Sequence, residues 1–192
     1  MRTIGILLFD EVEILDFAGP YEVFSIARDL SGIALFDVKT ISVQKSTIHA
    51  RNGLSINTDY NFSNCPSFDI LVIPGGFGTR PLLNDREVME WIEAQYKKVE
   101  IVMTVCTGSL LIGKLGLLDH LPYCTHHKAY NEMKKIAPTA IPQKERRYIQ
   151  TGKIFSSGGI SAGIDLAFHL LEQLHSKTIA MRTAEYMEYR LV

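Results

Sequence analysis

The stretch "EIVMTVCTGSLLIGKLGLL", residues 100–118, sets a cysteine between an apolar run and a helical pattern. Residues 100–105 predict a buried parallel strand, and residues 107–118 predict a short helix that closes near Gly116. A strand that stops one residue before a helix turns sharply, so Cys106 should be strained, with its side chain at the top of the sheet. Gly108 permits the close approach that such a turn needs. The stretch therefore predicts a nucleophile elbow in an α/β fold.

Strands and helices alternate along the rest of the chain. Apolar runs predict strands, and amphipathic patterns predict helices. Residues 53–62 read as short extended pieces on an excursion from the main sheet, and residues 123–127 as a strand edge. The main strands are expected at 3–9, 34–43 and 69–76, with a hairpin at 148–157 that turns at 151–153, and the helices at 19–30, 85–98, 128–136, 159–175 and 177–190. This order predicts a three-layer α/β sandwich with a mostly parallel central sheet, as a single domain over residues 1–192.

Two positions predict how individual helices begin. Pro20 fits the first turn of the helix at 19–30, whose apolar face would include Leu30. Ser176 is the expected N-cap of the last helix.

Composition excludes several classes of protein. The chain has 192 residues and a net charge of −1, with both signs scattered along it, which argues against a nucleic-acid partner. Acidic residues at 10–16 interrupt any signal peptide, and no apolar stretch would span a bilayer, so we expect a cytoplasmic protein without a membrane partner. The three cysteines are odd in number and lack C-x-x-C spacing, which suggests neither a disulfide framework nor a metal site.

Reactive residues follow three of the predicted strands. Asp16 follows the first, Gly75 and Gly76 follow the strand at 69–76, and Cys106 follows the next. Ligands bind beyond the carboxyl ends of parallel strands, so these residues should meet at one edge of the sheet. At a helix N-terminus, unpaired backbone N–H groups and the positive end of the helix dipole stabilise a thiolate. We therefore expect the pKa of Cys106 to be lowered.

Each neighbour of Cys106 has a functional and a structural interpretation. In the functional one, the amides of Gly76 and Thr107 form an oxyanion hole. In the structural one, the glycines of "PGG" (residues 74–76) only form an ordinary turn. Asp16 would shuttle a proton to the thiol, or it only caps the first helix. The imidazoles of His126 and His127 would serve as acid–base groups or orient a substrate, or they are structural.

Several motifs together resemble the ThiJ/PfpI superfamily, the relatives of class I glutamine amidotransferases. The matching stretches are "ILLFDEVEILDFAGPYEVF", "DILVIPGGFGTR", "VMTVCTGSLLIGKLGLLD", "THH" and "YIQTGKIFSSGGISAGIDLAFHLLE". The resemblance implies a flavodoxin-like fold, a homodimer and a nucleophilic Cys106. PfpI-type peptidases have His after the cysteine, and Thr107 here argues against a peptidase.

"LD-x-x-GP", "VCTG" and "TH" look most like the isonitrile hydratase branch and the amino-terminal domains of AraC-type regulators. Those regulators continue into a DNA-binding region, which we do not expect after Val192. The resemblance implies hydration of a small-molecule isonitrile to an N-substituted formamide, with Cys106 as nucleophile, Asp16 as proton carrier and no cofactor. Thr107, Gly76 and His126 would assist, and the substrate would contact Gly75, His127, Gly159 and Ile160.

Two other kinds of function stay open at this point. A glyoxalase or deglycase acting on α-oxoaldehydes would use the same thiol, and only Asp in place of Glu separates it from the hydratase. A non-enzymatic redox sensor or ligand-binding domain would also suit a reactive cysteine beside a carboxyl group.

Overall fold

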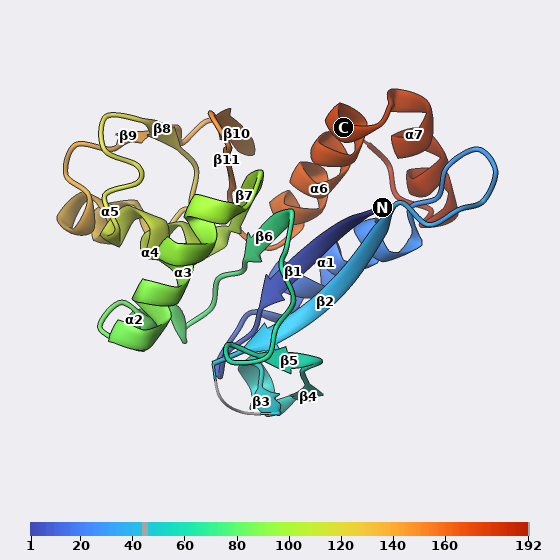
Figure 1. The fold of residues 1–192 in the computed structure, drawn as a ribbon. Coiled ribbons are helices and arrows are strands. Elements are labelled where there is room, and N and C mark those ends of the chain that lie inside the picture. Colours follow the sequence, from blue (N-terminus) through green and yellow to red (C-terminus); the bar gives the residue numbers. More distant parts are fainter. Residues whose placement is uncertain (44–45, 192) are drawn as a thin grey trace.

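The computed structural model describes residues 1–43 and 46–191 of the chain, and its centre is a seven-stranded sheet (Figure 1). The strand order is β10-β11-β7-β6-β1-β2-β5. All neighbouring strands pair in parallel except β10 and β11. The predicted mostly parallel sheet is confirmed. The strands are β1 (Arg2–Leu7), β2 (Phe36–Ser42), β5 (Tyr60–Asn61), β6 (Ile70–Ile73), β7 (Ile101–Val105), β10 (Tyr148–Thr151) and β11 (Ile154–Ser157).

Helices cover both faces of this sheet. Figure 1 shows one group on one side, α1 (Ile14–Ile26), α6 (Ser161–Leu174) and α7 (Lys177–Tyr186). The other group is α2 (Thr79–Leu82), α3 (Arg86–Lys98), α4 (Ser109–Lys114) and α5 (Tyr130–Ile136). β6 and β7 lie between these two helical layers and are buried at every position, which accounts for their unbroken apolar sequences. The predicted flavodoxin-like three-layer sandwich is confirmed.

The prediction for residues 53–62 was partly wrong. β3 (Thr47–His49) and β4 (Ser55–Asn57) form a separate antiparallel pair, with the 3₁₀ turn η1 (Arg51–Gly53) between them. This pair is the expected excursion, but β5 rejoins the main sheet beside β2. The strand edge expected at 123–127 also differs, since β8 (Pro122–Tyr123) pairs with β9 (Ile141–Pro142) and ends at Tyr123.

The first helix begins earlier than predicted. α1 starts at Ile14, so Pro20 lies inside it rather than in its first turn, and the helix ends at Ile26. Pro20 has no N–H for the carbonyl of Asp16, four residues earlier, and the helix continues despite this loss. Leu30 lies beyond the helix and is exposed. The pattern missed the true start because Glu13, at the N-cap position, makes no side-chain cap.

Other local predictions are confirmed. The hydroxyl of Ser176 accepts a hydrogen bond from the amide of Ile179 and caps α7. β10 and β11 form the expected hairpin, with Gly152 at a positive φ of 58° in its turn. α4 is shorter than expected, and Gly116 follows it at a φ of 74°. Within the described residues no helix is long and apolar enough to cross a membrane.

Candidate active site

Cys106 occupies a strained turn at the carboxyl end of β7. Its φ is 56°, and it begins the 3₁₀ turn η2 (Cys106–Gly108), which leads directly into α4. A side chain at Gly108 would collide with the carbonyl oxygen of Ile73 on β6. Glycine is therefore required there, and the predicted elbow geometry is present. The Cys106 side chain is 6% exposed.

Three hydrogen bonds to the backbone of Cys106 hold this turn in place. The Cys106 amide donates to the carbonyl of Gly158 at 3.1 Å. Its carbonyl accepts from the hydroxyl of Thr125 at 2.9 Å and from that of Ser109 at 3.1 Å. An unfavourable φ persists only where its surroundings over-determine it, and these three bonds do so.

Asp16 lies in the first turn of α1 and is fully buried beside the thiol. Its carboxylate accepts from the amide of Ile160 at 2.9 Å and from that of Gly75 at 3.1 Å. The carboxylate also forms a side-chain hydrogen bond with Cys106. Asp16 therefore joins three segments that are far apart in the sequence, and it does not cap its own helix.

Both acidic groups have raised pKa values. Burial raises the pKa of Asp16 from 3.8 to about 6, although hydrogen bonds from Ile160, Cys106 and Gly75 oppose the rise. Burial also raises the pKa of Cys106, and the negative charge of Asp16 raises it further. The expectation of a lowered thiol pKa was wrong, because desolvation and the neighbouring carboxylate outweigh the amide of Thr107. At neutral pH the pair carries one proton, on sulfur.

The glycines after β6 pack against Thr107 at close range. A Cβ at Gly75 would stand 2.5 Å from the Thr107 nitrogen and 2.8 Å from a carboxylate oxygen of Asp16, so only glycine fits. The Gly76 amide donates to the Thr107 hydroxyl at 2.9 Å. The structure thus differs from the predicted oxyanion hole, since the Gly76 amide is already paired within the protein. The Thr107 amide faces the sulfur and donates to it.

Two histidines lie at the end of β8, and only one of them reaches the pocket. A Cβ at Gly159 would stand 2.5 Å from Cδ2 of His126 and 3.3 Å from the Cys106 sulfur, so glycine at this position leaves room for the imidazole near the thiol. Burial lowers the pKa of His126, and positive charges on His127, Lys128 and Arg80 add to this. His127 is exposed, and its ring packs against that of His126 at 4.2 Å between centroids, outside the pocket's lining.

A pocket of about 150 Å³ opens over the thiol. Ile160 lines it in a strained backbone conformation, with φ of 57° and ψ of −103°. The wall also includes Gly76, Thr107, His126 and the thiol itself, and the remaining lining residues are Glu13, Arg51, Phe77, Arg80 and Lys128. The pocket therefore gathers most of the predicted site residues, while Asp16, Gly75 and Gly159 lie behind its wall.

The sequence analysis missed the charged part of the lining and the hydroxyl that holds the elbow. Arg80 follows "PGGFG" by two residues, and Thr125 precedes His126 directly. Their positions next to these motifs in the sequence could have indicated that both residues lie near the site. Arg51 comes from η1 on the excursion, and nothing in the sequence indicated that this segment returns to the site.

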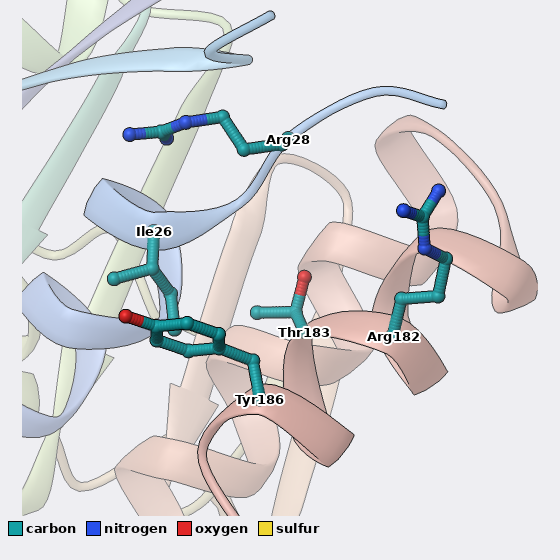
Figure 2. Close-up of a pocket in the computed structure, with 5 residues that line it drawn as sticks. All are labelled: Ile26, Arg28, Arg182, Thr183 and Tyr186. Carbon is teal, nitrogen blue, oxygen red and sulfur yellow. The ribbon is translucent and has the colours of Figure 1, made fainter. Parts of the chain in front are cut away.

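A second cavity, of about 290 Å³, lies where α1 ends and packs near α7 (Figure 2). It is lined by Ile26, Arg28, Arg182, Thr183 and Tyr186. The two guanidinium groups point in different directions (Figure 2), and Arg28 donates to the carbonyl of Ser25 at 2.8 Å. This cavity has no convergent polar groups and lies at the opposite end of α1 from Asp16.

Across residues 1–43 and 46–191, no three His, Cys, Asp or Glu side chains gather in a way that would hold a metal ion. The three cysteines are free thiols.

Comparison with known proteins identifies the family. The model of the DJ-1/PfpI family matches residues 2–173. The chain belongs to the DJ-1/PfpI family. A crystal structure of a ThiJ/PfpI family protein from Pseudomonas syringae superposes with a TM-score of 0.87 at 24% identity, over 98% of this chain and 75% of that one. DJ-1 from Schizosaccharomyces pombe gives 0.81 at 16% identity, over 98% and 100%. These two likenesses establish the fold.

Relatives within the family differ in what they do. The chain is 36% identical over 190 residues to isonitrile hydratase from Pseudomonas putida, covering 98% of this chain and 77% of that protein. It is 28% identical over 191 residues to the HTH-type transcriptional regulator GbdR from Pseudomonas aeruginosa, covering 100% of this chain. The chain spans only 52% of the regulator's length. The family thus includes enzymes and regulators.

Proposed function

We propose that this protein is a cysteine-dependent hydratase that converts an isonitrile and water to an N-substituted formamide. One observation carries the proposal, the hydrogen-bonded pair of Cys106 and Asp16 at the floor of a small pocket. Covalent catalysis needs a nucleophile with an acid–base partner in reach, and this pair supplies both. The 36% identity to isonitrile hydratase over 98% of the chain supports the same reaction.

In the first half of the proposed reaction, sulfur attacks the terminal isonitrile carbon. Because the proton starts on sulfur, Asp16 accepts it as the carbon–sulfur bond forms, and then delivers it to the same carbon. The product is a thioimidate, in which carbon is bound to sulfur, hydrogen and nitrogen. A carboxyl group with a pKa of about 6 is suited to both transfers near neutral pH.

In the second half, water adds to the thioimidate carbon, and one water proton reaches the nitrogen. The carbon–sulfur bond then breaks, the other water proton returns to sulfur, and the formamide leaves. Asp16 is again the group placed to carry these protons. The amides of Ile160 and Gly75 hold its carboxylate in position, and the Thr107 amide stabilises negative charge on the departing sulfur.

The test is an assay of purified protein with cyclohexyl isocyanide and, separately, with methylglyoxal. We expect formation of N-cyclohexylformamide, its loss in Cys106→Ser, and its retention in the control Cys65→Ser, because Cys65 is a half-buried thiol outside the pocket. Turnover of methylglyoxal alone would assign the glyoxalase reaction instead. Hydratase activity that survives Cys106→Ser would refute the nucleophile.

A ligand-binding role without turnover is the second candidate. The 28% identity to a transcriptional regulator over the whole chain favours it. Tight binding of an isonitrile with no product, equal in wild type and Cys106→Ser, would support this role. The redox-sensor alternative is weakened, because oxidation follows thiolate character and the pKa of Cys106 is raised.

A homodimer and a cytoplasmic location are also part of the proposal, as the family resemblance and the composition imply. Light scattering of the purified protein would test the first, with a mass near twice 21.6 kDa expected.

A further inference from the structure

The mouth of the pocket over Cys106 carries an excess of positive charge. Arg51, Arg80 and Lys128 line it, and Glu13 is the one carboxylate in that lining. Three cations against one anion give the lining of this pocket a net charge of +2. Two further carboxylates lie behind the lining, Glu132 paired with Arg80 and Asp16 beside the thiol, so the excess positive charge is at Lys128 and Arg51. The whole chain has a net charge of −1, so this local excess is not a property of the surface in general.

The three cations differ in how far they are already paired. Arg80 is held by Glu132 at 2.8 Å and by the carbonyl of Gly76 at 3.0 Å. Arg51 lies 3.8 Å from Glu13, which is beyond hydrogen-bond distance. The Lys128 ammonium group is exposed, and it has no ion pair or hydrogen bond among the residues that the structure describes. Lys128 and, in part, Arg51 are therefore available to an incoming anion.

An aromatic ring fixes the geometry of this mouth. Phe77 lines the pocket and is 58% exposed. The Arg51 guanidinium stacks over its ring at 4.1 Å, and that of Arg80 lies 5.7 Å from the ring centroid. Cation–π contacts of this kind hold a guanidinium in place while its N–H groups stay free for a carboxylate.

The pocket is small, and its lining places the charged groups near the thiol. Its volume of about 150 Å³ suits a small substrate, and Cys106, Lys128, Arg51 and Phe77 all line it. A substrate whose reacting carbon lies beside the sulfur therefore has its next substituents within reach of Lys128, Arg51 and Phe77.

We propose that the substrate is a small electrophile that carries a carboxylate, which Lys128 and Arg51 bind at the mouth of the pocket. Arg80 is a positioning residue, because it holds the Gly76 carbonyl and supports Phe77. The proposal rests on the proposed hydratase function in naming the electrophile an isonitrile. The charge selection itself depends only on the rim.

The first experiment compares isocyanoacetate with methyl isocyanoacetate, which have the same reacting group and differ in one charge. We expect the carboxylate to have the higher kcat/KM, by roughly fivefold for each contributing cation, and the preference to shrink as salt is added. Equal values for the two, or a preference for the ester, would overturn the proposal while leaving the hydratase reaction intact.

Two variants locate the preference. Lys128→Met and Arg51→Met should each lower the carboxylate-to-ester ratio by roughly fivefold. Lys98→Met is the matched control, because Lys98 is exposed at the end of α3 and precedes the amino end of β7, whereas Cys106 follows the carboxyl end of that strand. Lys128→Met also changes the surroundings of His126, but both substrates experience that change and it cancels in the ratio. An unchanged ratio in both rim variants would refute their role.

A second readout is independent of isonitrile turnover. Iodoacetate and iodoacetamide both alkylate a thiol, in a step where sulfur bonds to carbon, iodide leaves and the thiol proton is released. The rate ratio at Cys106, followed by peptide mass and divided by the ratio for 2-mercaptoethanol, should favour iodoacetate and fall in Lys128→Met. A normalised ratio of one or less would refute the anion-selective rim. Anion selection in the absence of isonitrile hydration would instead refute only the proposed reaction.

Discussion

Replacing Asp16 by Asn removes the buried carboxyl group whose ionisation opposes folding. Asn is close in size and keeps one oxygen, but it does not titrate. Any cost of placing its NH₂ group near the amides of Ile160 and Gly75 is the same at every pH. The pH dependence of the stability difference between the two proteins therefore isolates the ionisation of Asp16.

The magnitude follows from the pKa. Folding raises the pKa of Asp16 from 3.8 to about 6, and each pKa unit corresponds to about 1.4 kcal/mol, which gives about 3 kcal/mol in total. The raised pKa means that the folded state binds the proton more tightly than the unfolded state does. The stabilisation is fully present below pH 3.8 and is lost as the pH rises through about 6.

Urea denaturation of both proteins between pH 4 and pH 7.5 measures the effect. Wild type should lose about 2 kcal/mol relative to Asp16→Asn across that range, because the unfolded carboxyl is already partly ionised at pH 4. Asp29→Asn is the control, because Asp29 is exposed and hydrogen bonds from Ser31 and Ile33 lower its pKa. Its contribution disappears only as the pH falls below 3.8. A constant difference between wild type and Asp16→Asn would show that the carboxyl titrates normally, and the proton assignment of the pair would be wrong.

Three further predictions concern the same site. Between pH 5 and pH 8, kcat/KM for an isonitrile should rise about tenfold in total, reach half of its final value at about pH 6 and then level off, because Asp16 must be ionised to accept the thiol proton. A pH-independent rate would contradict this. Gly75→Ala should destabilise the protein by about 1–3 kcal/mol in thermal or urea unfolding, because the new methyl group would clash with the Thr107 nitrogen and the Asp16 carboxylate. Unchanged stability would refute that packing. Thr125→Val should lose about 1 kcal/mol by removing the hydrogen bond to the Cys106 carbonyl, whereas Thr125→Ser, which keeps the hydroxyl, should lose less.

Much of the fold was predictable because it depends on local pattern. The unbroken apolar runs at 69–76 and 100–105 identified strands that are buried on both faces. The Gly152 turn, the Ser176 cap and the Gly116 helix end all follow from the chemistry of one or two residues. The start of α1 was missed, because backbone bonding between Glu13 and Gly75, at 2.9 Å, fixes it rather than a side-chain cap. That residues 1–192 form one domain stays a prediction.

For the site, order along the chain predicted which residues meet. Parallel strands bring their carboxyl ends to one edge, so residues after β1, β6 and β7 had to lie near one another. The contribution of Arg51 was not predictable in this way. It depends on how the β3–β4 excursion folds back, which no local pattern records.

The sequence by itself determined the elbow, since a buried strand that stops at Cys106 with Gly108 two residues later leaves the chain little choice. It also determined the family, and it brought Asp16, Gly75 and Cys106 to the same end of the sheet. Only the tertiary structure decided where the proton lies. A thiol at a helix start favours the thiolate, but burial beside a fully buried carboxylate reverses that preference. Desolvation depends on every atom packed around a group, and the rim charges likewise act only through their arrangement in space.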